Sequence, residues 1–495
     1  MGIVYKQASK RTIFALIGAA IGVLSNLFIY SKKLDVYGEI QFIISMVSFF
    51  VPFASFGVVN LANRYYPYFK SEKNRDFGFF GNLILAGVVS YVIFLVVAVL
   101  FQNKYYKILS LIGFDLYAFK NYNSIIFICL FLLILNSITA MHINNFKKIV
   151  VPYLINTFSL KIFLPIVFIL NIYDWLTEDQ VYSSLIYFYM LGSILLFSYL
   201  FYIKEFNIKP KFSERLKANF KSILYYSFYG IIASMGSILA LKIDKIFLRG
   251  LTDDMNTGIY SSFIVIAGII AFPYDAIVNI SKPIIAASLK NNDHKNINKL
   301  YKQSSNTLLL LALYIYLLLV LNITNLLIVF NIYDAYYIGI SAFLFLGIGK
   351  VVDSAFSINF VILNLSKYYF ITFISMMGLS ICNIILNLKL IPIYGLKGAA
   401  ISTCVSIVFY NIIIYSFNWY LFKIQPFNWK SVGIIISSIV IYFLINFILI
   451  DLNLVLTIFL KSIIFTIAIF SANQFFRFSP EIADFLKNLK MKYSG

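Results

Sequence analysis

The sequence predicts an all-α polytopic membrane protein with about 14 transmembrane helices. Of its 495 residues 61% are hydrophobic and only 12% are charged, and the mean hydropathy is +0.87. Soluble chains are about 45–50% apolar and about 25% charged. The alternation of apolar and polar residues that a membrane β-barrel needs is absent from the sequence. We therefore expect a helical bundle whose membrane spans take up nearly the whole chain.

Apolar stretches of membrane length follow one another, separated by short charged segments. About 20 apolar residues cross the hydrocarbon core, and the first stretch is too long for a signal-peptide core. The predicted spans are residues 12–30, 39–61, 79–101, 123–142, 149–173, 181–203, 222–241, 257–280, 307–330, 337–363, 368–391, 396–422, 431–450 and 452–476. The longest connections, 102–122, 204–221 and 281–306, are too short to hold a catalytic domain.

A weak internal repeat suggests two six-helix lobes around a central cavity. The segment YGEIQFIIS…VPFASFGVVN, with Pro52, loosely matches GIYSSFIVI…AFPYDAIVN, with Pro273. Each lies in the second helix of a six-helix set. The predicted domains are an N-terminal lobe (1–203), a cytoplasmic connector (204–221), a C-terminal lobe (222–422), an additional helix pair (423–476) and a cytoplasmic tail (477–495).

The basic residues predict the orientation. Of the 40 Lys and Arg residues, 27 lie on the side that contains both termini and 10 on the opposite side. Because cytoplasmic loops are enriched in Lys and Arg, we expect both termini in the cytoplasm. The basic segments 204–221 and 282–302 are interpreted as topology signals and anionic-lipid contacts rather than a protein-partner site. The net charge of +20 therefore does not indicate nucleic-acid binding.

The residues needed for common membrane enzymes are missing from the sequence. Its two histidines, His142 and His294, are far apart, whereas a metalloprotease needs paired histidines. It has no GxxxxGK[ST] loop for ATP. The Asp253–Asp254 pair lies in a short loop, with no surrounding α/β domain for a sugar nucleotide. We expect no enzymatic activity, no metal and no cofactor.

Ionisable residues within predicted spans are the candidate site. Such residues are costly in a membrane and usually face a cavity or a partner. Lys161 lies at the middle of span 149–173, and Lys350 at the middle of span 337–363. Asp353 follows Lys350 on the same helix face, and Asp275 follows Pro273. We predict a positively lined cavity for an anionic head group, with Asp353 either neutralising Lys350 as an ion pair or taking part in ion coupling.

Two further candidates come from charges at span ends. Asp244 and Arg249, with Lys242 and Lys245, form a cluster at the outer end of span 222–241, where ordinary interfacial charge is the alternative explanation. Arg64 lies at the end of span 39–61. Arg64 and Arg249 are added to the cationic candidates, and Asp244 and Asp275 to the charge-partner or coupling candidates.

Helix-breaking residues mark candidate hinges. Pro52, Pro165 and Pro273 remove backbone hydrogen bonds inside spans, and Gly347 and Gly349 loosen the helix beside Lys350. Broken helices are typical of transporters that open alternately to the two sides, although prolines are also tolerated passively in spans.

Three stretches of the sequence resemble bacterial polysaccharide (O-antigen type) lipid flippases. They are the opening KQASKRTIFALIGAAIGVLSNLFIY with LDVYGEIQF, then KIDKIFLRG…NTGIYSSF at 242–263, and LIPIYGLKGAAIST at 390–403. These flippases belong to the multidrug/oligosaccharidyl-lipid/polysaccharide (MOP) exporter superfamily, which also holds multidrug exporters and the peptidoglycan-precursor flippase.

The resemblance implies translocation of an undecaprenyl-pyrophosphate-linked oligosaccharide from the cytoplasmic to the outer leaflet of a bacterial inner membrane, by alternating access, for cell-surface polysaccharide biosynthesis. The cationic role would fall on Lys161, Lys350, Arg64 and Arg249. Spans 431–450 and 452–476 would help to form a groove for the lipid tail. The resemblance also implies coupling to a sodium or proton gradient, membrane lipids as partners, and contact with a polysaccharide polymerase or chain-length protein.

Two other functions stay open. A multidrug or organic-cation exporter of the same superfamily would favour carboxylates in its cavity, whereas charge within the spans here leans positive. A non-transporting scaffold in an envelope assembly complex would have little need of charges at membrane depth.

Overall fold

The computed structural model describes residues 2–69, 78–212, 214–447 and 453–493. Within these ranges every regular element is helical and no strand is present. Twelve of the described helices are long and apolar enough to cross a membrane. The prediction of an all-α polytopic membrane protein is confirmed, and the bounds of most helices agree with the predicted spans to within a few residues.

The predicted spans and the twelve helices differ at two places. The predicted span 222–241 lies inside the 38-residue helix α12 (Glu214–Leu251), which is not one of the twelve. Spans 368–391 and 396–422 both lie in the 54-residue helix α18 (Tyr369–Phe422). That helix is kinked at Gly395, whose φ of 55° and ψ of −135° are not helical. Glycine tolerates this conformation because it has no Cβ.

The chain divides into two compact units, Met1–Ser261 and Ser262–Gly495. The boundary falls inside α13 (Asp254–Gly268), because α12 packs on helices of the first unit. The lobe boundary predicted at 204–221 stays a prediction. Elements of the first unit are α1 (Gly2–Phe28), η1 (Tyr30–Lys32), α2 (Leu34–Ala54), α3 (Val58–Arg64), α4 (Tyr66–Phe69), α5 (Phe79–Leu100), α6 (Gln102–Leu111), α7 (Tyr117–Asn121), α8 (Asn123–Asn144), α9 (Val150–Tyr153), η2 (Leu154–Phe158), α10 (Leu160–Ile172), α11 (Glu178–Tyr202) and α12.

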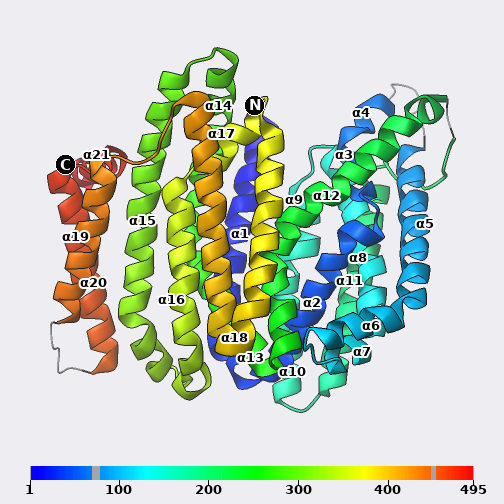
Figure 1. Ribbon diagram of the computed structural model, residues 1–495, viewed down its shortest axis with the longest axis horizontal. Helices are drawn as coiled ribbons and strands as arrows, with labels where there is room; N and C mark the ends of the chain where they lie inside the picture. Colours follow the sequence, from blue (N-terminus) through cyan, green and yellow to red (C-terminus); the bar gives the residue numbers. More distant parts are fainter. Residues whose placement is uncertain (1, 70–77, 213, 448–452, 494–495) are drawn as a thin grey trace. The chain divides into compact units, whose positions relative to one another are not determined.

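Helix α2 is central in the first unit, where it packs against α8 and α12 (Figure 1). Its residues Val36, Ile40, Ile43 and Val47 are fully buried. Their spacing of three or four residues places them on one helix face. Helix α1 packs on α10, and α11 packs on α8. The predicted connection 102–122 is not irregular, since α6 and α7 lie within it.

The second unit is organised around α15 and α16. Its elements after α13 are η3 (Ile269–Ala271), α14 (Phe272–Lys290), α15 (His294–Val329), α16 (Tyr333–Phe356), α17 (Asn359–Leu365), α18, α19 (Trp429–Asn446), α20 (Leu454–Phe476) and α21 (Pro480–Tyr493). Helix α16 packs between α15 and α18, and the pair α19–α20 packs on α15 (Figure 1). Leu309, Leu310 and Leu313 of α15 share a buried cluster with Phe465 and Ile469 of α20.

Several predicted spans are interrupted rather than continuous. Span 39–61 breaks between α2 and α3, where Phe56 and Gly57 have positive φ. Span 149–173 contains the π-helical turn η2, and span 257–280 contains the 3₁₀ turn η3. Span 337–363 ends its first helix at Phe356, before Ser357 with φ of 51°. All four of these spans carry predicted hinge candidates, but the apolar length that defined the spans does not give the positions of the interruptions.

Candidate transport site

Lys161 is a half-buried cation in the first unit. It belongs to the membrane-length segment Val150–Ile172, and its aliphatic stem lies against Gly18 of α1. A Cβ on Gly18 would lie 3.0 Å from Cδ of Lys161, so the small residue makes room for the side chain. Among the described residues Lys161 has no hydrogen-bond or ion-pair partner. An unpaired cation of this kind typically faces a cavity or a ligand.

A π-helical turn immediately precedes Lys161. In this turn the Ser159 amide donates to the Leu154 carbonyl at 2.9 Å, five residues back. Such π-turns are frequent at functional sites because they rotate the following side chains relative to an α-helix. Helix α1 contributes a second cation near this turn. The Arg11 guanidinium lies 5.4 Å from the centre of the ring of Tyr153, the residue that directly precedes the turn.

Lys350 is the half-buried cation of the second unit. It lies on α16 next to Gly349. A Cβ on Gly349 would lie 3.4 Å from Cδ1 of Ile407 on α18. In the described part of the chain no ion pair joins Lys350 to Asp353, although the two are three residues apart on one helix. The geometry does not support a self-neutralising pair, and Lys350 is left without a carboxylate.

Asp353 belongs instead to a chain of asparagines at the end of α16. Its Oδ1 accepts from Asn411 Nδ2 at 3.0 Å, and Asn359 Nδ2 donates to Asn411 Oδ1 at 3.2 Å. Asn418 Nδ2 donates to the Asn359 carbonyl at 2.9 Å. All three asparagines are buried. These hydrogen bonds link α16, α17 and α18 across the break at Ser357. Asp353 is therefore connected to the backbone conformation at that break.

Arg249 is fully paired in the first unit. Its Nη2 and Nε donate to Glu39 Oε1 at 2.6 and 2.8 Å, and its Nη1 donates to Asp115 Oδ2 at 3.2 Å. Glu39 is 3% exposed and Arg249 5%. The guanidinium therefore joins α2, α12 and the segment before α7, and its charge is already neutralised.

The neighbours of Arg249 on α12 are also held by polar partners. Lys245 Nζ donates to Gln41 Oε1 at 2.6 Å, and the Tyr260 hydroxyl donates to Asp244 Oδ2 at 3.0 Å. The structure thus places Asp244 in a buried hydrogen bond to the first turns of α13. The sequence reasoning missed Glu39 and Gln41, which stand two residues apart in the stretch LDVYGEIQF. Residues at this spacing do not lie on one helix face, so the pattern did not single them out.

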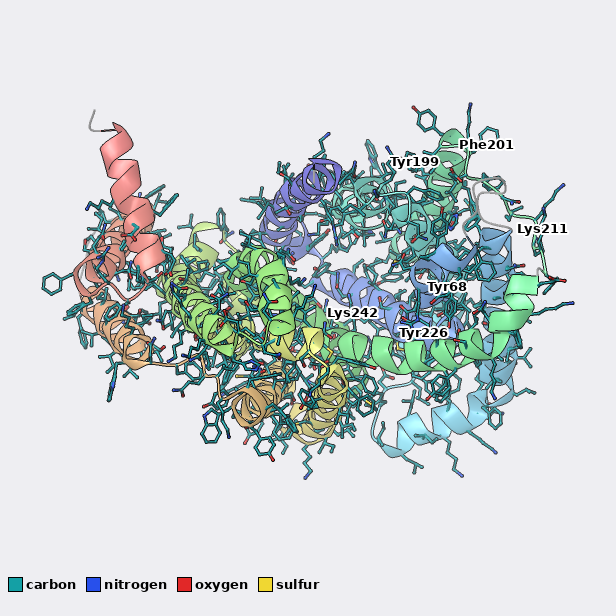
Figure 2. The ribbon with its side chains drawn as sticks, turned by 90° about the horizontal axis from the view of Figure 1, so that it is seen from above. Tyr68, Tyr199, Phe201, Lys211, Tyr226 and Lys242 are labelled. Carbon is teal, nitrogen blue, oxygen red and sulfur yellow. The ribbon has the colours of Figure 1, made fainter. Side chains whose placement is uncertain are left out.

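Arg64 and Asp275 are exposed on the units that carry them. Arg64 ends α3, with its guanidinium 4.5 Å from the centre of the Tyr226 ring on α12; Tyr226 is labelled in Figure 2. Asp275 lies in the first turn of α14, where a carboxylate is favoured by the helix dipole. Among the described residues, no ion pair joins Arg64 to the first-unit candidate Lys161, or Asp275 to the second-unit candidate Lys350, in agreement with their exposed positions.

The hinge candidates fall into two groups. Pro52 lies three residues before the α2–α3 break, and Pro273 opens α14 directly after the 3₁₀ turn. Pro165 lies inside a continuous α10, and the π-turn that sequence reasoning missed follows Pro152 instead. Gly347 and Gly349 lie in an uninterrupted α16, where a Cβ on Gly347 would lie 2.3 Å from the Tyr316 ring. The close approach of the Tyr316 ring explains why a glycine stands at position 347.

Comparison with known families identifies the chain. The family model described as polysaccharide biosynthesis protein matches residues 33–287, more than half of the sequence. The chain belongs to this family. Of the three stretches that carried the resemblance, the one at 242–263 and the LDVYGEIQF part of the first lie inside the match. No match is found among curated proteins.

Solved structures show that this member of the polysaccharide biosynthesis family has the MOP-superfamily fold. Lipid II flippase MurJ in an inward closed conformation is similar over 94% of this chain and 98% of that chain, with TM-score 0.66 and 16% identity. An inward-facing multidrug resistance MATE transporter is similar over 83% and 98%, with TM-score 0.58 and 10% identity. A MOP superfamily transporter from Pyrococcus furiosus has TM-score 0.53 and 11% identity over 85% and 96%. The chain is a multi-pass membrane protein of this fold.

Proposed function

We propose that the protein moves an undecaprenyl-pyrophosphate-linked oligosaccharide from the cytoplasmic to the outer leaflet of the bacterial inner membrane, by alternating access, for cell-surface polysaccharide biosynthesis. The observation that carries the proposal is the pair of half-buried lysines, Lys161 and Lys350, which lack carboxylate partners among the described residues. A pyrophosphate would supply the missing negative charge through charge-assisted hydrogen bonds. Membership of the polysaccharide biosynthesis family supports a saccharide substrate.

The helix breaks supply the conformational freedom that this function needs. Transporters of alternating access use discontinuous helices. The breaks at Ser55–Gly57 and η2 lie in the first unit, and those at η3 and Ser357 in the second. In this proposal Asp353 couples transport to a sodium or proton gradient, because binding of a cation there would alter the asparagine chain across the Ser357 break.

The test is made in the native host, with both termini expected in the cytoplasm. Depletion of the protein should cause lipid-linked oligosaccharide to accumulate on the cytoplasmic face. Wild type should restore transport, whereas Lys161→Ala and Lys350→Ala at equal expression should lower it by about tenfold or more, since a hydrogen bond to a charged group contributes about 1.5–3 kcal/mol.

Lys461→Ala is the matched control, because Lys461 is also a half-buried lysine within a membrane-length helix, α20. Its variant should transport like wild type. If all three variants relieve the accumulation equally, the proposed flippase function would stand, but the lysine site would be rejected.

A multidrug exporter is the second candidate, supported by the MATE transporters among the structural neighbours. In that case depletion should leave lipid-linked oligosaccharides unchanged and should sensitise the cells to cationic dyes. The same strain therefore separates the two functions. Contact with a polymerase or chain-length protein remains part of the flippase proposal alone.

A further inference from the structure

An apolar groove lies in the first unit, apart from Lys161 and from the Arg249 ion pairs. Its volume is about 540 Å³, and its walls come from α3, α5, α12 and the segment before α12. Along α5 it extends from Phe79 to Ile93. At 1.5 Å per residue this is about 21 Å, somewhat more than one leaflet of a hydrocarbon core that is about 30 Å thick.

One end of the groove is closed by a tight crossing of α3 and α12. A Cβ on Gly57 would lie 2.1 Å from the Ser227 carbonyl oxygen, so only glycine permits this approach. Asn60 Nδ2 donates to the Gly230 carbonyl at 3.1 Å and fixes the crossing. Because the crossing is made by backbone atoms, the depth of the groove is set by the fold.

The other end is framed by the basic segment that precedes α12. The chain at 208–211 lies on the first turn of α5, where Gly78 and Gly81 leave room for it. Asn82, in the groove wall, donates to the Lys211 carbonyl at 2.8 Å. The hydroxyl of Tyr65, also in the wall, forms a 2.7 Å hydrogen bond with Ser222 Oγ.

Apolar side chains on the α12 side of the groove wall are exposed. Phe220, Leu224 and Phe228 line it and are 54%, 55% and 63% exposed. They are spaced by four residues and form one stripe on α12. An exposed stripe of this size is covered by lipid or by another molecule in a membrane protein.

Four exposed lysines gather at the framed end. Lys209, Lys211, Lys217 and Lys221 are all exposed there, against one described carboxylate in the same stretch, Glu214. Figure 2 shows Lys211 beside the first turn of α12, which then runs past Tyr226 to Lys242. An apolar slot with a basic mouth complements a molecule that has one anionic group on an apolar chain.

We propose that this groove binds an anionic phospholipid of the surrounding membrane, with one acyl chain along α5 and the phosphate among Lys211, Lys217 and Lys221. The length of the groove suits an acyl chain of one leaflet and is too short for an undecaprenyl chain. The site is therefore distinct from the transport site, and its occupancy fixes α12 against α3 and α5.

The test uses the purified full-length protein in micelles with equimolar phosphatidylglycerol and phosphatidylcholine, followed by native mass spectrometry. Wild type should retain phosphatidylglycerol over phosphatidylcholine by about tenfold or more. Ala86→Trp, which fills the groove, should remove the retained lipid. Leu191→Trp, at an exposed position of α11 that is outside the groove, should not.

The head-group part of the site is tested by charge removal. The triple variant Lys211→Gln, Lys217→Gln, Lys221→Gln should reduce the preference to near one, whereas Lys290→Gln, Lys295→Gln, Lys299→Gln, with the same change of charge, should keep it. Equal retention of both lipids by wild type overturns the proposal. So does displacement of phosphatidylglycerol by equimolar undecaprenyl phosphate in wild type, which would assign the groove to the transported lipid. If Ala86→Trp fails to fold, the lysine variants decide.

Discussion

At the scale of single residues, paired and unpaired cations have different roles in this protein. Arg249 is held by Glu39 and Asp115, whereas Lys161 and Lys350 have no carboxylate among the described residues. A buried ion pair adds little net stability over apolar residues, but removing one partner is costly because the other charge stays buried. Arg249 is thus a structural residue, whereas the two lysines are the cations on which the proposed function depends.

The ion pair between Glu39 and Arg249 gives the first prediction. Glu39→Leu or Arg249→Met alone should lower the free energy of unfolding by about 3–5 kcal/mol, because each leaves a buried charge unpaired. The double variant should recover most of this loss. Thermal melting of the purified proteins in detergent measures all three. A double variant that is as unstable as the sum of the singles would show that the two residues do not act as a pair.

Asp353 gives a second prediction. Asn411→Ala removes its hydrogen-bond donor and interrupts the asparagine chain, so it should cost about 1–3 kcal/mol of stability. Asp353→Asn keeps a polar side chain of the same size and should melt close to wild type, while abolishing the sodium or proton dependence of transport. Transport by Asp353→Asn that keeps its full ion dependence would remove Asp353 from coupling.

At the scale of helices, close approach between backbones is decided by glycine. The start of α2 crosses the start of α13 so closely that a Cβ on Gly38 would lie 1.8 Å from the Asp254 carbonyl oxygen. A Cβ on Gly258 would lie 2.0 Å from the Leu34 carbonyl oxygen. The two glycines thus face each other's helices at one crossing.

The crossing gives a third prediction. Gly38→Ala should lower stability by about 1–3 kcal/mol or more, because the added methyl group forces the helices apart. Gly378→Ala is the control, since no atom lies within 4 Å of its Cβ position on α18. It should be neutral or stabilise by up to about 1 kcal/mol through helix propensity. Equal melting temperatures for the two variants would contradict the tight crossing.

The sequence predicted helices well and their interruptions poorly. Apolar length defines a span, so most helix bounds agree with prediction. The breaks at Ser357 and Leu154–Phe158 depend on the backbone conformation of ordinary residues, which hydropathy does not report. Pro52 and Pro273 lie near two of the breaks, as expected for a residue that removes a helical hydrogen bond. Pro165 shows the limit of that rule, since α10 continues through it.

The candidate site was predictable only in part. Lys161 and Lys350 stand out because lysine is rare in an apolar stretch, and the structure leaves both half-buried and unpaired. Arg249 looked equivalent in sequence, since its partners Glu39 and Asp115 are more than 130 residues away along the chain. Long-range pairing of this kind has no signal in a single sequence.

At the scale of the whole molecule, the fold and the family differ in how much they indicate about the substrate. The MOP-superfamily fold is shared by flippases and multidrug transporters, so it does not select a substrate. The match to polysaccharide biosynthesis proteins supports the saccharide-bearing substrate of the proposed function. The chemistry of unpaired lysines then favours an anionic head group over an organic cation.

The most direct test of the proposed flippase function uses purified protein in proteoliposomes that carry the host's undecaprenyl-pyrophosphate-linked oligosaccharide. Sugar that reaches the opposite leaflet is oxidised by impermeant periodate. Wild type and Lys461→Ala should expose the oligosaccharide at equal rates, and the Lys161→Ala, Lys350→Ala double variant should expose it at least about tenfold more slowly. Exposure no faster than in protein-free liposomes would contradict the proposed flippase.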